Sequence, residues 1–395
     1  MVFSLKRINP LLFILLLFSV NGAQAGLTPL LGSQLDNQSL YASGYITLGA
    51  ETTVGGNIQS TASVTVAAGA IVGGNIESGT TTTLGASAGV GGYIESTKTV
   101  TLGASATVDG SIQAGTTSTI GASSKIQGDL MTGTTATIAA QVEVDGDVLA
   151  GSTVTVGADS IFGGNVDAGT TTTIGAGVKI NGELTSNSSQ TVSPAPVVMN
   201  QEELITSVQT TLKELGKGTE LVSTTFGTND EILEAGIYST INYLSIAMGK
   251  TLTLDGKGID GSWVFNISNY LSFAANAKVI LNNVTDNSSI IWNVLGDKTG
   301  SAGYTQLGAG AEVRGYIFAK GFVQTGANAL IAGVGNDCGR AFSATNFIEF
   351  GANSVIGNEG CTNGAVAKVT PIPEPTSIWL FGLGILVLTF ITKRS

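Results

Sequence analysis

The chain has 395 residues, of which 55 are glycine and 11% are charged, with two cysteines and no histidine. Its length allows two or three domains, and with a net charge of −11 it offers no basic patch to neutralise phosphates, which excludes nucleic acid as a partner. The chain also has no nucleophile elbow and no phosphate-binding glycine loop followed by lysine, so we expect no enzyme, no cofactor and no metal site.

Residues 1–25 have the pattern of a secretory signal peptide. Lys6 and Arg7 precede an apolar run from Leu11 to Val20, and the small residues Ala23 and Ala25 provide a cleavage site. The alternative is a transmembrane helix, for which this apolar run is short. The pattern predicts that the chain is exported.

Residues 26–186 contain an 18-residue repeat. A small pair of residues marks each copy in strict register: Gly49-Ala50, Ala67-Ala68, Gly85-Ala86, Gly103-Ala104, Gly121-Ala122, Ala139-Ala140, Gly157-Ala158 and Gly175-Ala176. Each copy has three positions that are always apolar, the first set being Leu48, Val54 and Ile58, and the apolar period within each segment is two. This pattern predicts a three-sided parallel β-solenoid, each coil burying its apolar side against the next. A glycine stands at 56, 74, 92, 110, 128, 146, 164 and 182, where we expect corners whose backbone dihedrals favour glycine.

Threonine dominates the outward positions of the first strand in every coil. One column is complete and its neighbour, two positions earlier, is nearly so; together they contain Thr47, Thr65, Thr81, Thr83, Thr99, Thr101, Thr117, Thr119, Thr135, Thr137, Thr153, Thr155, Thr171 and Thr173, with Tyr45 and Ser63 as the exceptions. One interpretation is that threonine is simply a good strand former. Propensity acts on all three strands, however, and only one carries threonine throughout. A regular uncharged face favours a regular partner, and we expect that partner to be ice.

Residues 187–199 are a polar linker with Pro194 and Pro196, and residues 200–216 change to a helical period. We expect Asn200 to cap this helix together with Glu203, and Gly216 to end it. The apolar stripe of the helix, from Leu204 to Leu215, should dock lengthwise on one face of the solenoid.

Residues 217–362 return to a less regular strand pattern, in which the Gly-Ala pair reappears at Gly308-Ala309 and, after the same interval, at Gly326-Ala327. The positions equivalent to the two threonine columns hold aromatic residues in one column, Tyr304, Phe322 and Phe347, and Gln306, Gln324 and Glu349 in the other. An aromatic stripe on an outer face needs a cover, and we expect the helix to supply it. The alternative is an exposed platform that binds carbohydrate.

Several motifs of the second half resemble the β-solenoid ice-binding protein family of bacteria and fungi. They are EAGIYST at 234–240, KTLTLDGKGIDGSWVFNISNYLSF at 250–273, IIWNVLG at 290–296 and LGAGAEVRGYIFAK at 307–320. The resemblance covers roughly 200–357 and implies a three-faced solenoid with one long α-helix packed alongside, and a flat, often threonine-rich face that binds ice. The eight regular coils before the helix depart from the family's usual pattern.

The two cysteines, Cys338 and Cys361, flank the last coil of an exported chain. An oxidising compartment predicts a disulfide between them, worth roughly 3 kcal/mol by closing the loop. Free buried thiols are the alternative.

After a linker at 363–372, the tail at 373–395 has the layout of a short membrane anchor. Pro373, Glu374 and Pro375 precede an apolar run from Ile378 to Ile391, and Lys393 and Arg394 follow it. This arrangement resembles the PEP-type C-terminal sorting signal of Gram-negative bacteria. The resemblance implies a membrane peptidase as partner, cleavage near the motif, and a mature protein that is released or attached at the cell surface after transient anchoring.

The sequence as a whole therefore predicts an exported, non-catalytic protein whose threonine face binds ice and ordered water. The first rival is a structural cell-surface or exopolysaccharide-matrix protein or adhesin without ice activity, in which the columns only stiffen a rod. The second is a carbohydrate-binding solenoid that uses the aromatic stripe.

Overall fold

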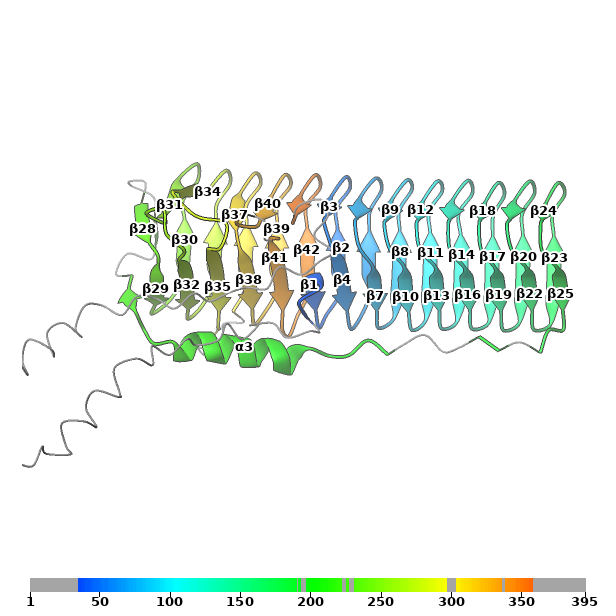
Figure 1. The fold of residues 1–395 in the computed structure, drawn as a ribbon, viewed down its shortest axis with the longest axis horizontal. Coiled ribbons are helices and arrows are strands. Elements are labelled where there is room, and N and C mark those ends of the chain that lie inside the picture. The colour runs from blue at the N-terminus through cyan, green and yellow to red at the C-terminus, as the bar shows by residue number, and fades with distance from the viewer. Residues whose placement is uncertain are drawn as a thin grey trace, which may run out of the picture.

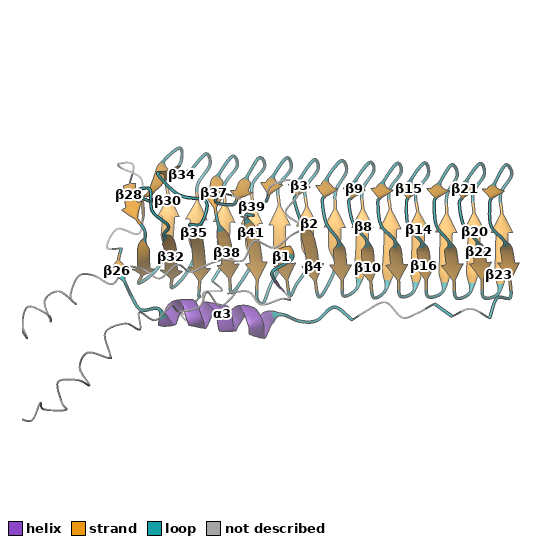
Figure 2. Cartoon of the chain, in the orientation of Figure 1, coloured by secondary structure: helices purple, strands orange, loops and turns teal. Residues whose placement is uncertain are grey.

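The computed structural model describes residues 35–189, 191–192, 197–221, 225–226, 231–296, 303–335 and 338–357. The fold is a straight three-sided solenoid built from three parallel sheets, with one helix alongside (Figures 1 and 2). This confirms the predicted fold class. The predicted signal peptide and the sorting tail lie outside the described residues.

Each of the three sheets runs along the whole solenoid, and strands that are neighbours in space are hydrogen-bonded. In spatial order, sheet A consists of β25 (Leu184–Ser186), β22 (Val166–Ala168), β19 (Val148–Ala150), β16 (Leu130–Thr132), β13 (Ile112–Ala114), β10 (Ile94–Ser96), β7 (Ile76–Ser78), β4 (Asn57–Ser60), β1 (Gln38–Ala42), β41 (Arg340–Ser343), β38 (Tyr316–Ala319), β35 (Ser289–Val294), β32 (Ser262–Ile267), β29 (Gly236–Thr240) and β26 (Thr219–Glu220). Sheet B consists of β23 (Thr171–Ile174), β20 (Thr153–Val156), β17 (Thr135–Ile138), β14 (Thr117–Ile120), β11 (Thr99–Leu102), β8 (Thr81–Leu84), β5 (Val64–Val66), β2 (Ile46–Leu48), β42 (Ile348–Phe350), β39 (Val323–Thr325), β36 (Thr305–Leu307), β33 (Leu271–Phe273), β30 (Leu244–Ile246) and β27 (Thr225–Phe226). Sheet C consists of β24 (Lys179–Ile180), β21 (Ile161–Phe162), β18 (Glu143–Val144), β15 (Lys125–Ile126), β12 (Thr107–Val108), β9 (Gly89–Val90), β6 (Ile71–Val72), β3 (Thr53–Val54), β43 (Val355–Ile356), β40 (Leu330–Ala332), β37 (Glu312–Arg314), β34 (Lys278–Asn282), β31 (Thr251–Asp255) and β28 (Glu231–Glu234).

The two halves of the chain form one continuous stack. The first half starts in the middle of this stack, and the second half starts at one end of it. The first half begins in the middle with β1 and runs outward to β25; the chain then returns along the stack to the helix, and the second half runs from the opposite end back to the middle (Figure 1). There β43 pairs with β3 in parallel, Ile356 opposite Val54. Both side chains are completely buried, so the junction is as well packed as any pair of coils.

The eight glycines that recur once per coil, from Gly56 to Gly182, were predicted to supply unusual backbone dihedrals at corners. None of them has a positive φ. The left-handed position lies earlier in each coil, beginning at Glu51 (φ 56°) and recurring once per coil, and most copies fill it with a residue other than glycine. The glycines are needed because successive coils touch there: a Cβ on Gly128 would lie 2.6 Å from the Ser111 nitrogen. The prediction of corner dihedrals was therefore wrong, and close coil-to-coil contact is the reason for the repeat.

We expect Gly128→Ala to destabilise the first half by about 3 kcal/mol, because the added methyl forces two coils apart. Gly89→Ala is the matched control, since its nearest atom would be the Thr107 hydroxyl oxygen at 3.3 Å, and we expect a change within about 0.5 kcal/mol. Thermal unfolding followed by circular dichroism measures both variants. Equal stabilities would contradict the contact argument.

The helix α3 (Glu202–Glu214) lies along sheet A of the second half, beside β32, β35 and β41. It starts slightly later than predicted: Gln201 is the N-cap residue, while Asn200 Oδ1 accepts hydrogen bonds from the Glu202 nitrogen (2.9 Å) and the Tyr41 hydroxyl (3.0 Å). Gly216 follows the helix with φ 104°, as expected.

Apolar packing and buried amides together fix α3 in place. Ile205, Val208 and Leu212 are buried in a cluster with aromatic residues of sheet A, whereas Leu215, the last residue of the predicted stripe, is 40% exposed. Gln209 Nε2 donates to the carbonyls of Val294 (3.0 Å) and Phe318 (3.1 Å). These buried hydrogen bonds set the position of the helix along the sheet, which apolar contacts alone would leave less defined.

Candidate functional site

The threonines singled out in the sequence form two straight columns on the outer surface of sheet B. Parallel pairing places Thr81, Thr99, Thr117, Thr135, Thr153 and Thr171 in one column, and Thr47, Thr65, Thr83, Thr101, Thr119, Thr137, Thr155 and Thr173 in the other. We call these fourteen residues the Thr face. Their side chains are exposed or half-buried and none is buried. The structure therefore brings all the predicted residues onto one surface.

The coil interior determines which way these threonines point. In β11, Val100 and Leu102 alternate with Thr99 and Thr101, and both apolar side chains are buried. Successive side chains of a strand point to opposite faces, so burying one set projects the other outward. The Thr99 and Thr117 hydroxyls lie 3.2 Å apart, within hydrogen-bonding distance across adjacent coils.

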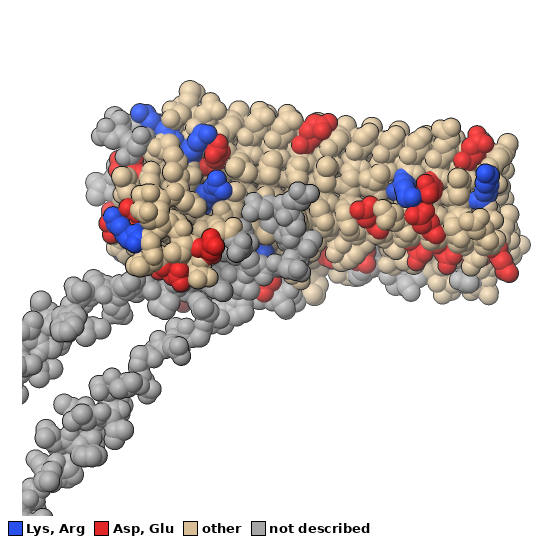
Figure 3. Space-filling model, turned by 45° about the horizontal axis from the view of Figure 1, so that its top comes forward, with Lys and Arg blue, Asp and Glu red and all other residues tan. Residues whose placement is uncertain are grey.

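The Thr face is flat, long and almost free of charge. Its two columns are about 6.6 Å apart along a strand, and coils repeat about every 4.8 Å, so the eight coils span about 35 Å. Neither column contains a charged residue in the first half. Charged side chains are also sparse on the neighbouring surface, with uncharged stretches between them (Figure 3). The helix covers sheet A, so it leaves the Thr face open.

The aromatic stripe of the second half lies on the same sheet as the Thr face. The prediction that the helix covers this stripe was wrong. The helix packs on Tyr316, Phe318 and Phe342 of sheet A and not on the outer residues of sheet B. Six half-buried or exposed rings stack in one column there: Tyr243, Tyr270, Tyr304, Phe322, Phe347 and Tyr45.

These rings cover one another. Their centroids are 4.9–5.1 Å apart and the planes differ by 2–8°. At the end of the column the Tyr45 hydroxyl donates to Glu349 Oε1 (2.7 Å), and this hydrogen bond is the main reason why the pKa of Tyr45 rises to about 12. Both faces of the four inner rings lie against neighbouring rings, so these rings lack the open faces on which a sugar would stack.

Tyr243 and Tyr270 were missed as members of this column. The repeat interval of the first half connects Tyr304 to Phe322, but the coils before Tyr304 are longer, so the same interval does not connect Tyr243 to Tyr270. The longer spacing is shared by Leu244 and Leu271, which pair in adjacent coils. That shared spacing could have indicated that Tyr243 and Tyr270 belong to the column.

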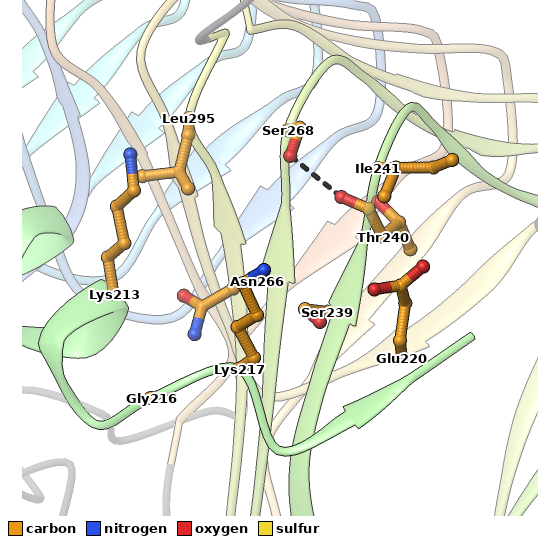
Figure 4. A pocket seen from close by; sticks show the side chains of 10 residues that line it. All are labelled: Lys213, Gly216, Lys217, Glu220, Ser239, Thr240, Ile241, Asn266, Ser268 and Leu295. Carbon is orange, nitrogen blue, oxygen red and sulfur yellow. Dashed lines mark hydrogen bonds between the residues drawn. The ribbon is translucent and has the colours of Figure 1, made fainter. Parts of the chain in front are cut away.

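A cleft of about 430 Å³ opens beside the C-terminal end of α3 (Figure 4). Lys213 and Lys217 lie on the helix side, and Ser239, Asn266 and Ser268 come from sheet A and the turn after it. The Ser268 hydroxyl donates to the Thr240 carbonyl oxygen (2.7 Å). Glu220 is the only carboxylate in the lining, and within the described ranges no three histidine, cysteine or acidic side chains are grouped to hold a metal ion.

Cys338 is buried and disulfide-bonded. Its predicted partner, Cys361, lies outside the described residues, so the pairing stays a prediction. The sorting residues Pro373, Glu374 and Pro375 and the apolar run after them also lie outside. In the part of the chain that is described, no helix has the length and apolar character needed to cross a bilayer.

Comparison with known families matches two segments of the chain. Residues 191–356 match the family described as ice-binding-like. This segment is therefore similar to an ice-binding-like domain. It comprises α3 and the whole second half of the stack, and it agrees closely with the segment whose motifs resembled that family in the sequence. The Thr face lies in the coils that precede it and continue its sheets.

Residues 371–394 match the PEP-CTERM protein-sorting motif, which indicates export. No curated protein matches the chain. Solved structures similar to this chain include an ice-binding protein from the Antarctic ascomycete Antarctomyces psychrotrophicus (19% identity, 56% of this chain and 92% of that one, TM-score 0.33). Another is a glycosylated ice-binding protein from an Arctic yeast (18% identity, 58% of this chain and 93% of that one, TM-score 0.34). A third is an ice-binding protein from an Antarctic bacterium of the Flavobacteriaceae (14% identity, 86% of this chain and 98% of that one, TM-score 0.32).

Proposed function

We propose that this protein is exported and binds ice through the Thr face. The observation that carries the proposal is the pair of threonine columns, one complete and one nearly complete, on a straight, uncovered part of sheet B where neither column has a charged residue. The ice-binding-like domain in the same stack supports it. Each threonine offers a methyl group and a hydroxyl at a position set by the coil beneath it.

The mechanism depends on many weak contacts made at once. Water next to the methyl groups is ordered between the two columns, and the hydroxyls anchor that layer by hydrogen bonds. A single threonine contributes little, but engagement of fourteen rigid sites makes the second and later contacts intramolecular. Rigidity matters because ordering a mobile surface would cost conformational entropy for every contact.

The export route supports a role outside the cell. The signal pattern at 1–25 and the sorting motif at 371–394 lead the chain across the inner membrane, where the apolar run anchors it transiently before a sorting peptidase acts. The product is secreted or held at the surface of a Gram-negative cell. There the Thr face can meet extracellular ice.

The direct test is ice recrystallisation inhibition and thermal hysteresis of the exported chain. We expect inhibition at micromolar concentration. A rival structural role in an exopolysaccharide matrix predicts the same rigid rod without effect on ice. Ice growth indistinguishable from a buffer control would therefore remove the ice-binding proposal and leave the structural one.

A further inference from the structure

One end of the solenoid, formed by β23, β24 and β25, exposes inward side chains of its last coil, and we call it the open end. These strands are last in their sheets and, among the described strands, pair on one side only, with β20, β21 and β22. Three strand edges with unsatisfied backbone groups therefore point along the solenoid axis. Edges of this kind recruit further strands unless the protein blocks them.

The inward side chains at the open end are also uncovered. Leu184 is 49% exposed and Ile180 is only partly buried. Their equivalents one coil earlier, Val166 and Phe162, are completely buried. Solenoids usually end in a polar capping repeat, whereas this end exposes an unmodified interior coil.

The other two coil ends of the molecule differ from the open end in their side chains, although β26, β27 and β28 at the far end also pair on one side only among the described strands. At the far end the inward side chains Leu221 and Phe226 are 8% and 3% exposed. In the middle, the end coil of the first half is capped by the end coil of the second, with Ile46 paired to Ile348. The chain thus already caps one bare coil with another bare coil, and among the described coil ends the open end exposes its inward side chains most, with Leu184 49% exposed.

The chain's own termini are poorly placed to act as the cap. The open end lies seven coils, about 35 Å, beyond the first coil, near which both described ends of the chain lie. Residues 26–34 would span at most about 30 Å when fully extended. Residues 358–372 could reach it only by extending for most of their length, which leaves too few to pair with three strands.

We propose that the open ends of two copies of this chain pack against each other to form an end-to-end dimer. A twofold axis normal to sheet B pairs β23 with its copy in antiparallel fashion and exchanges the positions of sheets A and C. This brings the exposed Lys179, on sheet C, toward Glu183 of the second copy, which precedes β25 of sheet A. Because a twofold contact uses the open end of both copies, it stops at two copies and forms no fibre.

The dimer has a consequence for the Thr face. Sheet B of the two copies becomes one sheet, and the two threonine arrays lie end to end in the same plane. The length of this face doubles. That consequence rests on the proposed function, whereas the dimer itself follows from the open end alone.

The test is sedimentation equilibrium and small-angle scattering of the chain purified in the form that the host exports. Intact-mass spectrometry of the same sample identifies its N-terminal and C-terminal residues. We expect twice the mass of one chain and a long axis that increases from about 65 Å to about 130 Å, from 14 coils per copy. A monomer, including one shielded by its own uncleaved tail, or a dimer of unchanged length would overturn the proposal.

Two variants locate the contact. Leu184→Glu should weaken the dimer about 100-fold, because each copy would bury an unpaired carboxylate. Ile71→Glu is the matched control: it adds the same charge on the side of the solenoid, in sheet C and far from the open end, where Ile71 is 51% exposed, and should leave the dimer intact. Persistence of the dimer in a folded Leu184→Glu variant would overturn the proposal.

A charge exchange covers the case in which Leu184→Glu unfolds the last coil. Lys179→Glu changes an exposed side chain, so the coil should fold, and it should weaken the dimer by placing like charges together. The double variant Lys179→Glu with Glu183→Lys should restore it. Failure of the double variant to restore the dimer would contradict the proposed twofold arrangement. Ice assays on the same samples report on the Thr face separately, since a dimer without ice activity would refute only the proposed function.

Discussion

Thr119→Tyr is expected to reduce ice recrystallisation inhibition by about tenfold or more, because it places a bulky ring in the middle of a flat array that must engage ice at many sites. Thr119 lies in β14, in the middle of the Thr face, with neighbours Thr101 and Thr137 in the adjacent coils. A tyrosine ring there stands above the plane of the methyl groups. It therefore holds the flanking coils away from a planar crystal.

The same substitution should leave the fold intact. The Thr119 side chain is exposed and points away from the core, and tyrosine is a favourable strand residue. Thr107→Tyr is the matched control, since Thr107 is an exposed strand residue of the adjacent sheet C, in the coil before Thr119. Circular dichroism should be the same for both variants and the wild type.

Three outcomes are informative. Loss of activity in Thr119→Tyr alone places ice contact on sheet B. Equal loss in both variants would indicate a general effect on the solenoid, and full activity in Thr119→Tyr would show that ice is bound elsewhere. The aromatic column of the second half would then be the next surface to test, with Phe322→Ala.

The sequence was sufficient to predict the first half almost residue by residue. A strict period leaves one solution: each coil repeats the last, so the position of Thr83 determines those of Thr101 and Thr119. The alternation of buried and exposed residues in β8 and β11 follows the pattern seen in the sequence. Local pairing of identical coils requires no long-range information, and this explains the success.

The sequence did not determine which face receives the helix. An apolar stripe needs an apolar surface, and two aromatic sets were available, one around Phe322 and one around Phe318. The signal lay in strands such as β32 and β35, in which every residue is buried and the alternation expected of a one-sided strand is lost. A strand without alternation has both faces covered. Asn266 and Asn293, whose side chains donate to carbonyls of α3, mark the same face.

The order of the coils in space was also beyond the reach of pattern analysis. Coil-to-coil contacts within each half are between neighbours in sequence, but the junction joins β3 to β43, which lie near opposite ends of the described chain. The repeat does not predict which end coils pack together, since any bare coil could pack on any other. We expect the buried side chain of Arg340, which lies next to the junction, to make this pairing specific.

Arg340→Met is expected to lower the free energy of unfolding by about 3 kcal/mol, because it removes a buried guanidinium that holds the start of the first half. Arg340 is 1% exposed, and its Nη1 donates to the carbonyl oxygens of Leu35 and Gln38 (both 3.2 Å) and of Asp36. The guanidinium carbon also lies 5.7 Å from the centroid of the Tyr316 ring. Methionine fills much of the volume but leaves these carbonyls without their donor.

Removing Arg340 should act on the junction rather than on one half. Leu35 packs beside α3, and β1 follows it directly, so loosening this segment uncovers β41 and the helix together. Lys320→Met removes the same charge from an exposed residue of the same half and should change stability by less than about 0.5 kcal/mol. Denaturant unfolding measures both variants. Unchanged stability of Arg340→Met would show that strand pairing between β1 and β41 alone holds the two halves in one stack, and that the specificity of the junction has another source.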